Sequence, residues 1–389
     1  MHITHVNPAE MNTSFNFLGK SLQLYRYPKR FTHPSWQAWD AADELILDHI
    51  QQNQDNIDQT NIVILNDDFG ALSCWLHYAN IHHVSDSLVS QMACKQNISL
   101  NNLDNTQITY IDSLAQMPQQ PDWVIIKIPK TLALLEHQLI QLQSVVSANT
   151  KIVAAAKAKM IQKSTLSLFE KYLGKTHTSL AKKKARLVFC EPNLGLQQKP
   201  SPYPTVWKMD QEPFTINNHA NVFARQQIDI GARLLIDNLP DCTAKTVVDL
   251  GCGNGVLGLC ILKRYDNAEV IFIDESYMAV ASAKLNVQNN LPTQMHRARF
   301  IVSNCLEQLE NQTQIDMVIC NPPFHQLNTI TDHIATQMFE EAHLKLKKGG
   351  ELRIIGNRHL EYPQKLKRLF GGYNVISSDK KFSILSSLK

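Results

Sequence analysis

Short apolar runs rich in β-branched residues alternate with longer amphipathic stretches along the whole chain. A strand buried on both faces reads as a continuous apolar run, whereas a helix shows an apolar stripe with a period near 3.6 residues. Alternation of the two predicts parallel sheets covered by helices on both faces. The predicted strands of the first half are residues 61–66, 82–86, 108–112, 122–127, 151–156 and 185–190. Those of the second half are residues 246–250, 269–274, 299–303, 316–320, 351–356, 374–377 and 382–386.

The two halves repeat the same order of elements. In each half a long amphipathic helix leads into a strand, in residues 131–157 and again in residues 330–357. We predict an internal duplication that gives two tandem α/β domains, each a doubly wound sheet with a C-terminal antiparallel hairpin. The first domain is expected at residues 1–192 and the second at 209–389. Residues 193–208 are rich in Pro and Gln and lack periodicity, so they are predicted to be the linker.

The totals fit two domains of ordinary size. The 389 residues are 44% hydrophobic and 19% charged, which allows each domain its own core. The longest apolar runs fall far short of the roughly 18 residues that a membrane-spanning helix needs. No basic start followed by an apolar stretch opens the chain, so we expect a cytoplasmic protein with no membrane partner. The eight cysteines show neither a CxxC pair nor zinc-site spacing, so we expect no metal.

Positive charge gathers in one part of the first half. Residues 151–190 contain ten Lys and Arg against a single acid, whereas residues 1–150 contain seven against fourteen. A basic block of this kind is often only a solvated face. The alternative is a surface that binds the phosphates of a nucleic acid, because clustered Lys and Arg supply the salt-dependent part of such affinity.

The stretch TVVDLGCGNGVLGLC predicts a buried strand, a glycine-rich turn and the start of a helix. Gly251, Gly253 and Gly255 let backbone N–H groups approach a ligand at the helix N-terminus. Gly258 completes a GxGxxG spacing, so a dinucleotide is one candidate ligand. Asp249 favours S-adenosylmethionine instead, because a carboxylate here can meet the ammonium group of that cofactor and would repel a pyrophosphate.

Two further polar residues follow strands at the same predicted edge of the sheet. Asp274 ends the run VIFID, where a carboxylate suits a ribose diol in either cofactor. Asn304 follows RFIVS and either hydrogen-bonds an adenine edge or closes a turn. Neither residue separates the two cofactors.

The stretch NPPF, residues 321–324, follows the apolar run DMVIC. An exocyclic amine must be oriented before it can attack a methyl group, because its lone pair is delocalised into the ring. The side-chain oxygen of Asn321 and the backbone carbonyl of Pro322 could accept the two N–H bonds and stabilise the developing positive charge. Proline fixes φ and removes competing donors, and Phe324 offers a face for stacking. A nicotinamide oxidoreductase would have no use for this stretch.

With DLGCGNG, Asp274 and NPPFH, the second half resembles the Rossmann-type S-adenosylmethionine-dependent methyltransferases. The NPPF version is found in methylators of amino groups, namely DNA adenine methylases, release-factor glutamine methylases and ribosomal RNA guanine-N2 methylases. The duplication favours the last group, since nearly the whole chain resembles the bacterial tandem-domain rRNA guanine-N2 methyltransferase family. That resemblance implies Rossmann-like domains, S-adenosylmethionine as cofactor and guanine N2 as target. It favours 23S over 16S rRNA as the substrate.

The same resemblance implies roles for individual residues. Asn321, Pro322 and Phe324 would hold the guanine. Asp229 belongs to the stretch FARQQIDIGARLL, which would close over the cofactor and target. The residues expected to hold the cofactor are Asp249, Gly251, Gly253, Asp274, Asn304 and Asp229.

The first half copies this plan without its chemistry. Aligning the strands by sequence places Leu65 opposite Asp249, and places side chains opposite the three glycines of the turn. KIPK, residues 127–130, stands opposite NPPF, and an ammonium group cannot accept an N–H. We therefore predict a degenerate domain that binds RNA, and a non-catalytic RNA-binding assembly factor remains the alternative for the whole chain. The predicted RNA-binding residues are Lys127, Lys130, Lys157, Lys182, Lys183, Lys184 and Arg186.

Overall fold

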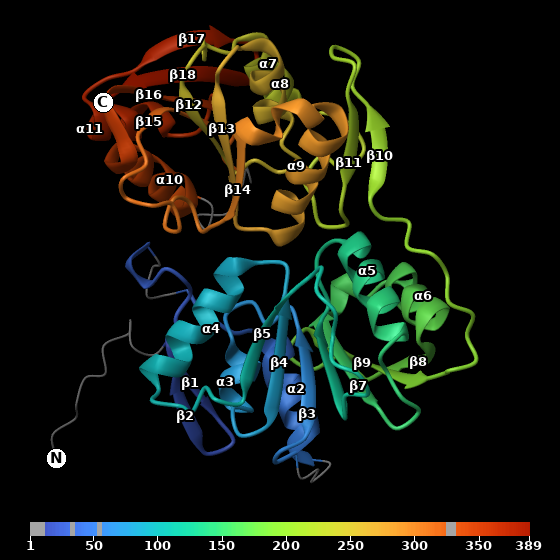
Figure 1. Cartoon of the computed structure of the whole chain (residues 1–389). Coiled ribbons are helices and arrows are strands. Elements are labelled where there is room, and N and C mark those ends of the chain that lie inside the picture. The colour runs from blue at the N-terminus through green and yellow to red at the C-terminus, as the bar shows by residue number, and fades with distance from the viewer. Residues whose placement is uncertain (1–11, 32–35, 53–56, 324–331) are drawn as a thin grey trace, which may run out of the picture. The chain divides into compact units, whose positions relative to one another are not determined.

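The computed structural model describes residues 12–31, 36–52, 57–323 and 332–389. The chain divides into two compact units, Met1–Ser201 and Pro202–Lys389. They are called the N-terminal unit and the C-terminal unit below, and each is described by itself (Figure 1).

The N-terminal unit opens with a short hairpin and continues as alternating strands and helices. Its strands are β1 (Ser14–Phe17), β2 (Lys20–Gln23), β3 (Asn61–Leu65), β4 (Asn80–Ser85), β5 (Ile108–Asp112), β6 (Trp123–Lys127), β7 (Lys151–Lys157), β8 (Gly174–Thr178) and β9 (Ala185–Pro192). Its helices are η1 (Lys29–Phe31), α2 (Ala41–Gln52), α3 (Ala71–Trp75), α4 (Leu88–Leu100), α5 (Leu132–Gln143), η2 (Ala158–Met160) and α6 (Lys163–Tyr172).

The C-terminal unit repeats this order. Its strands are β10 (Thr205–Lys208), β11 (Thr215–Asn218), β12 (Thr246–Leu250), β13 (Glu269–Asp274), β14 (Ala298–Val302), β15 (Ile315–Cys320), β16 (Leu346–Asn357), β17 (Asn374–Ser378) and β18 (Phe382–Leu388). Its helices are α7 (Ile230–Asp237), α8 (Val256–Arg264), α9 (Tyr277–Asn290), η3 (Pro292–Arg297), α10 (Asp332–Lys345) and α11 (Tyr362–Phe370).

The two main sheets have the same seven-stranded topology. Their orders are β5-β4-β3-β6-β7-β9-β8 and β14-β13-β12-β15-β16-β18-β17. The first five strands of each order pair in parallel, and the last two form an antiparallel hairpin. This topology confirms the predicted fold class. The matching strand orders support the predicted duplication. Strand β10 lies inside the segment 193–208, which the sequence predicts as linker.

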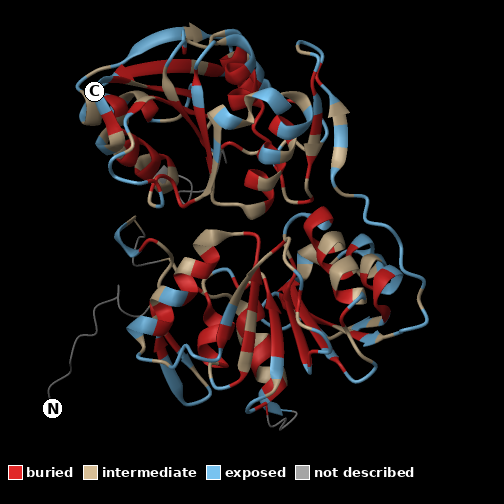
Figure 2. Ribbon diagram, viewed as in Figure 1, coloured by how far each residue is buried: buried red, intermediate tan, exposed pale blue. Residues whose placement is uncertain are grey.

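Helices cover both faces of each sheet, so the central strands are buried (Figure 2). In the N-terminal unit, α2, α3 and α4 pack on one face and α5 and α6 on the other. In the C-terminal unit, α7, α8 and α9 cover one face and α10 and α11 the other. Burial on both faces is why the strands read as continuous apolar runs in the sequence.

Each unit carries an N-terminal hairpin that the sequence pattern did not predict. In the N-terminal unit, the amide of Asn97 bonds the backbone of Tyr25, and Asn101 bonds the backbone of Gln23. In the C-terminal unit, Asn286 and Asn290 hold β11 through the same pattern of bonds. The duplication therefore includes the hairpin and its side-chain anchors. Strands of only four residues offer too little alternation to detect.

The turn after the first core strand has one backbone conformation in both units. Gly251 and Gly255 have φ of 72° and 78°, and the residues in their places, Asn66 and Gly70, have 62° and 79°. The N–H of Gly251 donates to Ile273 and that of Asn66 to Val84, at equivalent positions of β13 and β4. Leu65 therefore corresponds to Leu250. The alignment made from sequence was wrong by one residue.

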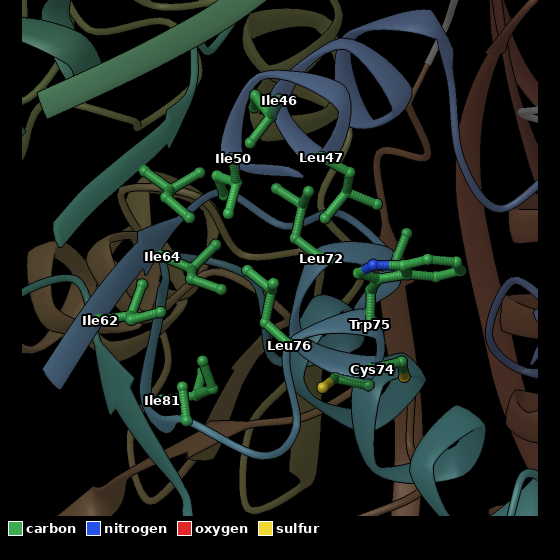
Figure 3. Close-up of a cluster of buried hydrophobic side chains, with 14 of the residues drawn as sticks. Ile46, Leu47, Ile50, Ile62, Ile64, Leu72, Cys74, Trp75, Leu76 and Ile81 are labelled. Atoms are coloured by element: carbon green, nitrogen blue, oxygen red, sulfur yellow. The ribbon is translucent and has the colours of Figure 1, made fainter. Parts of the chain in front are cut away.

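With the corrected alignment, Ile64 stands where the C-terminal unit has Asp249. Ile64 is fully buried and packs with Leu72 of α3 and Ile46 of α2 in an apolar cluster (Figure 3). A carboxylate under this turn is therefore not needed for the fold.

Candidate active site

A cavity of about 470 Å³ opens at the carboxyl ends of β12, β13 and β15. This is the edge of a doubly wound sheet at which ligands bind. The volume is in the range of small-molecule sites. Seven of the residues predicted from the sequence line it: Asp229, Gly251, Gly253, Asp274, Asn304, Asn321 and Pro322.

The glycine turn forms one wall of the cavity. A side chain at Gly253 would meet no atom within 4 Å, although its φ of 55° strains any other residue. At Gly255 a Cβ would come within 2.8 Å of Ala283, so this glycine serves close packing of α9 rather than the ligand. The open space over Gly253 is what close approach of a cofactor to the backbone requires.

Asp274 is held at the end of β13 by backbone donors. Its carboxylate accepts from the N–H of Gly253 at 3.0 Å and from that of Ser276 at 3.0 Å. These bonds fix a partly exposed carboxylate at the cavity wall. A carboxylate only accepts hydrogen bonds, so Asp274 suits the hydroxyl donors of a ribose diol.

Asn304 presents a buried amide to the cavity. It is 8% exposed, and its Nδ2 donates to no group in the described part of the chain. A buried donor without a partner costs free energy unless a ligand satisfies it. The ring nitrogens of an adenine are acceptors that fit. With the open glycine turn and Asp274, the residues present fit S-adenosylmethionine.

Asp249 does not line the cavity, which corrects the prediction that it meets the cofactor's ammonium group. Its side chain is fully buried beneath the turn, and Oδ2 accepts from the N–H of Gly258 at 3.0 Å. Oδ1 has no hydrogen-bond partner among the described residues. Burial raises the pKa of this carboxyl to about 7, the bond from Gly258 opposes the rise and the charge of Asp274 adds to it. Its place is structural, under the first turn of α8.

Asn321 begins the stretch that follows β15, and its side chain reaches the N-terminus of α7. Its Nδ2 donates to Oδ2 of Asp229 at 3.3 Å. Its Oδ1 is buried and accepts no hydrogen bond from any described residue. Asn321 and Pro322 both line the cavity, so the site includes one buried amide oxygen that has no partner among the described residues. Phe324 lies outside the described residues.

Comparison with known proteins shows the family of this chain. The RLMG N-terminal domain model matches residues 12–194, and the methyltransferase small domain model matches residues 213–386. The ribosomal RNA large subunit methyltransferase G of Pseudoalteromonas atlantica is 54% identical, over 97% of this chain and all of its own length. That of Aeromonas salmonicida is 52% identical, over 95% of this chain and 97% of its own. The chain belongs to the ribosomal RNA large subunit methyltransferase G family.

A solved structure shares the fold of this family member over both units. The 16S rRNA N2 methyltransferase of T. thermophilus, in complex with AdoMet and guanosine, matches with a TM-score of 0.74. The match covers 97% of each chain at 18% identity, so it supports the tandem fold. The predicted family and fold class are both confirmed.

Some residues that line the cavity were not named individually from the sequence. Phe223 and Ala224 line it from the segment before α7, and Met338 lines it from α10. Phe223 is 69% exposed, and Ala224 has a φ of 55°. Phe223 and Ala224 open the stretch FARQQIDIGARLL, which the sequence predicts to close over the cofactor and target. Met338 is far from that stretch along the chain and belongs to no motif, so no signal in the sequence joins it to the site.

Lys127 must be removed from the predicted RNA-binding residues. It is 8% exposed, and its Nζ lies 2.9 Å from Oδ1 of Asp40 and 2.7 Å from Oδ1 of Asp43. These carboxylates raise the pKa of Lys127 against the lowering effect of burial. An ammonium group enclosed in this way is not available to a phosphate.

The other basic residues on that list differ in their surroundings. Lys182 and Lys183 are exposed but pair with Asp48 and Glu44 of α2. Arg186 is half-buried. Of the lysines on that list, three are exposed and form no salt bridge within residues 12–31, 36–52, 57–323 and 332–389: Lys130, Lys157 and Lys184.

No helix among the described residues is long and apolar enough to cross a membrane. The described residues also contain no group of three or more His, Cys, Asp or Glu side chains that could hold a metal ion.

Proposed function

We propose that this chain transfers a methyl group from S-adenosylmethionine to the exocyclic N2 of a guanine in 23S ribosomal RNA. The observation that carries the proposal is the buried Oδ1 of Asn321, a residue that lines the cavity, which accepts no hydrogen bond from any described residue. The relatives named above are methyltransferases of the large ribosomal subunit, and guanine N2 is named for the enzyme whose fold the chain shares.

The cofactor would lie over the glycine turn. Gly251 and Gly253 give it access to the backbone, Asp274 would accept from its ribose, and Asn304 would donate to its adenine. When bound, S-adenosylmethionine supplies an electrophilic methyl group on a sulfonium. The protein's part is to hold that group and the target amine in line, and orientation of this kind is worth roughly 7–11 kcal/mol of the barrier.

The target amine would be held by two acceptors. Oδ1 of Asn321 and the carbonyl of Pro322 would each accept one N–H, which turns the nitrogen lone pair toward the methyl group. The same oxygens stabilise the positive charge that develops on nitrogen. No dedicated general base is required before the attack, because the proton can leave the nitrogen afterwards. Stacking by Phe324 is part of the proposal.

The N-terminal unit would bind the RNA rather than catalyse. Lys130, Lys157 and Lys184 carry exposed positive charge suited to phosphates. Lys182, Lys183 and Arg186 could contribute once their present contacts exchange with phosphates. The enzyme would work in the cytoplasm, where ribosomal RNA is modified.

Transfer of labelled methyl groups tests the proposal. The purified protein, labelled S-adenosylmethionine and rRNA from cells that lack the gene should give N2-methylguanine in 23S rRNA. Methylation of 16S rRNA alone would reassign the substrate. Binding of rRNA without binding of S-adenosylmethionine in calorimetry would indicate an assembly factor instead. Asn321→Ala should lower kcat about 100- to 1,000-fold, the usual cost of losing one preorganised hydrogen bond, and leave cofactor affinity in place.

A further inference from the structure

One oxygen of Asp229 serves two neighbours. Oδ2 accepts from the N–H of Ala232 at 3.1 Å, which caps helix α7, and from Nδ2 of Asn321 at 3.3 Å. A carboxylate accepts hydrogen bonds and has none to donate. The amide of Asn321 must therefore turn its NH₂ group toward Asp229, and its carbonyl oxygen, which is buried near Gly231, is left without a partner among the described residues.

We propose that Asp229 is a positioning residue that fixes the amide of Asn321 with its oxygen toward the target amine. It was predicted from the sequence to hold the cofactor, and the contact with Asn321 assigns it a different task. The inference rests on the proposed function, since it concerns the same reaction. Without Asp229, the amide could rotate and present a donor, which the N–H groups of guanine N2 cannot use.

Gly231 supports this assignment. A Cβ built at this position would lie 2.9 Å from Oδ2 of Asp229 and 3.5 Å from Oδ1 of Asn321. Gly231 lies within α7, and its φ is not among the positive values, so the backbone conformation does not require a glycine. The space around the Asp229–Asn321 pair does require one.

The N-terminal unit contains the same contact with different residues. Asp40 precedes α2 as Asp229 precedes α7, and Lys127 occupies the place of Asn321. Nζ of Lys127 donates to Oδ1 of Asp40 at 2.9 Å. The position of Gly231 is taken by Ala42, which is 1% exposed. In the unit where no methyl transfer is expected, the aspartate pairs with a lysine, and both the amide acceptor and the open space beside it are absent.

Two substitutions separate capping from positioning. Serine caps a helix about as well as aspartate, but its shorter side chain would not reach Asn321 while it caps. Asparagine also caps, and its carbonyl oxygen can take the place of Oδ2 and accept both bonds. Asp229→Ser should therefore lose the positioning contact only, and Asp229→Asn should keep much of it.

The measurement is steady-state kinetics on 23S rRNA with calorimetric titration of S-adenosylmethionine. Asp229→Ser should lower kcat about 10- to 100-fold, since the acceptor is present but no longer preorganised, with cofactor affinity and melting temperature close to wild type. Asp229→Asn should restore a large part of kcat. A wild-type kcat in Asp229→Ser would overturn the proposal, and so would a loss confined to cofactor affinity.

Gly231→Ala provides an independent variant in case serine disturbs the loop before α7. Alanine favours a helix more than glycine does, so the fold should be retained while the methyl group displaces the Asp229 carboxylate. A fall in kcat with an unchanged melting temperature supports the proposal, and an unchanged kcat contradicts it. Failure of the proposed function itself would be distinct, because wild-type protein would then methylate no rRNA.

Discussion

The two units build the same turn from different residues. Both place a left-handed residue directly after the first core strand and a left-handed glycine before the next helix. Beneath the turn, the C-terminal unit buries the carboxylate of Asp249 against Gly258, and the N-terminal unit buries Ile64. The fold thus constrains the backbone of the turn but leaves the side chains free. The backbone of the turn therefore does not decide which side chain lies beneath it.

In the N-terminal unit, polar side chains in contact with one another lie at the positions of Gly258 and Phe272. Ser73 stands in the place of Gly258, and its N–H and Oγ both donate to Oδ2 of Asp67 at 2.8 Å. His83 stands in the place of Phe272, and its Nδ1 lies 3.0 Å from Oγ of Ser73. This buried network is satisfied within the protein, so it needs no ligand. This is consistent with a unit that binds no cofactor at this turn.

The largest effect, on kcat, is expected when Asn321 of the C-terminal unit is replaced by lysine, the residue at the same place in the N-terminal unit. Asn321→Lys would place an ammonium group beside Asp229, as Lys127 lies beside Asp40. Because ammonium only donates, kcat should fall by about 1,000-fold or more, while calorimetry still detects S-adenosylmethionine. Measurable turnover near wild type would show that the acceptor is not needed.

The next largest effect concerns the ion pairs of Lys127. Lys127→Met should lower the free energy of unfolding by about 3–5 kcal/mol, because it leaves Asp40 and Asp43 near each other without a cation. Urea unfolding would measure it. Lys182→Met, which breaks an exposed pair with Asp48, is the matched control and should cost no more than about 1 kcal/mol. Equal losses in the two variants would refute the buried role of Lys127.

Asp249 should make stability depend on pH. Its folded pKa of about 7 lies above the ordinary value of 3.8, so its favourable contribution exists below pH 4 and is lost as the pH rises through 7. Wild type without cofactor should therefore lose more stability than Asp249→Asn between pH 5 and 8, by at most about 3 kcal/mol. Asp43, whose pKa burial also raises to about 7, is common to both proteins and cancels. Parallel pH profiles would contradict the prediction.

The smallest effect tests the packing under the turn. A Cβ at Gly258 would collide with the ring of Phe272, whereas the N-terminal unit has Ser73 and His83 at these positions. Gly258→Ala should destabilise the protein by about 1–3 kcal/mol, as overpacking does. Gly372→Ala is the control, because a Cβ there meets nothing within 4 Å. Chemical denaturation compares the two, and a neutral Gly258→Ala would refute the close packing.

The sequence by itself determined most strands of the two main sheets and several residues of the cavity. Strands β12 and β13 begin and end where the apolar runs predict, since burial on both faces leaves a continuous signal. Gly251, Gly253, Asp274, Asn304 and Asn321 were found because they follow strands directly, and the ends of parallel strands meet at one edge.

Only the tertiary structure decided which polar side chains face the cavity. Asp249 and Lys127 have ordinary sequence surroundings, yet one lies beneath the turn and the other between two carboxylates. Asp229 precedes Asn321 by 92 residues, and only packing of α7 against the end of β15 brings them together. Strand periodicity is a local property of the chain. The direction of a buried side chain and its partners depend on segments that the chain brings together only when it folds.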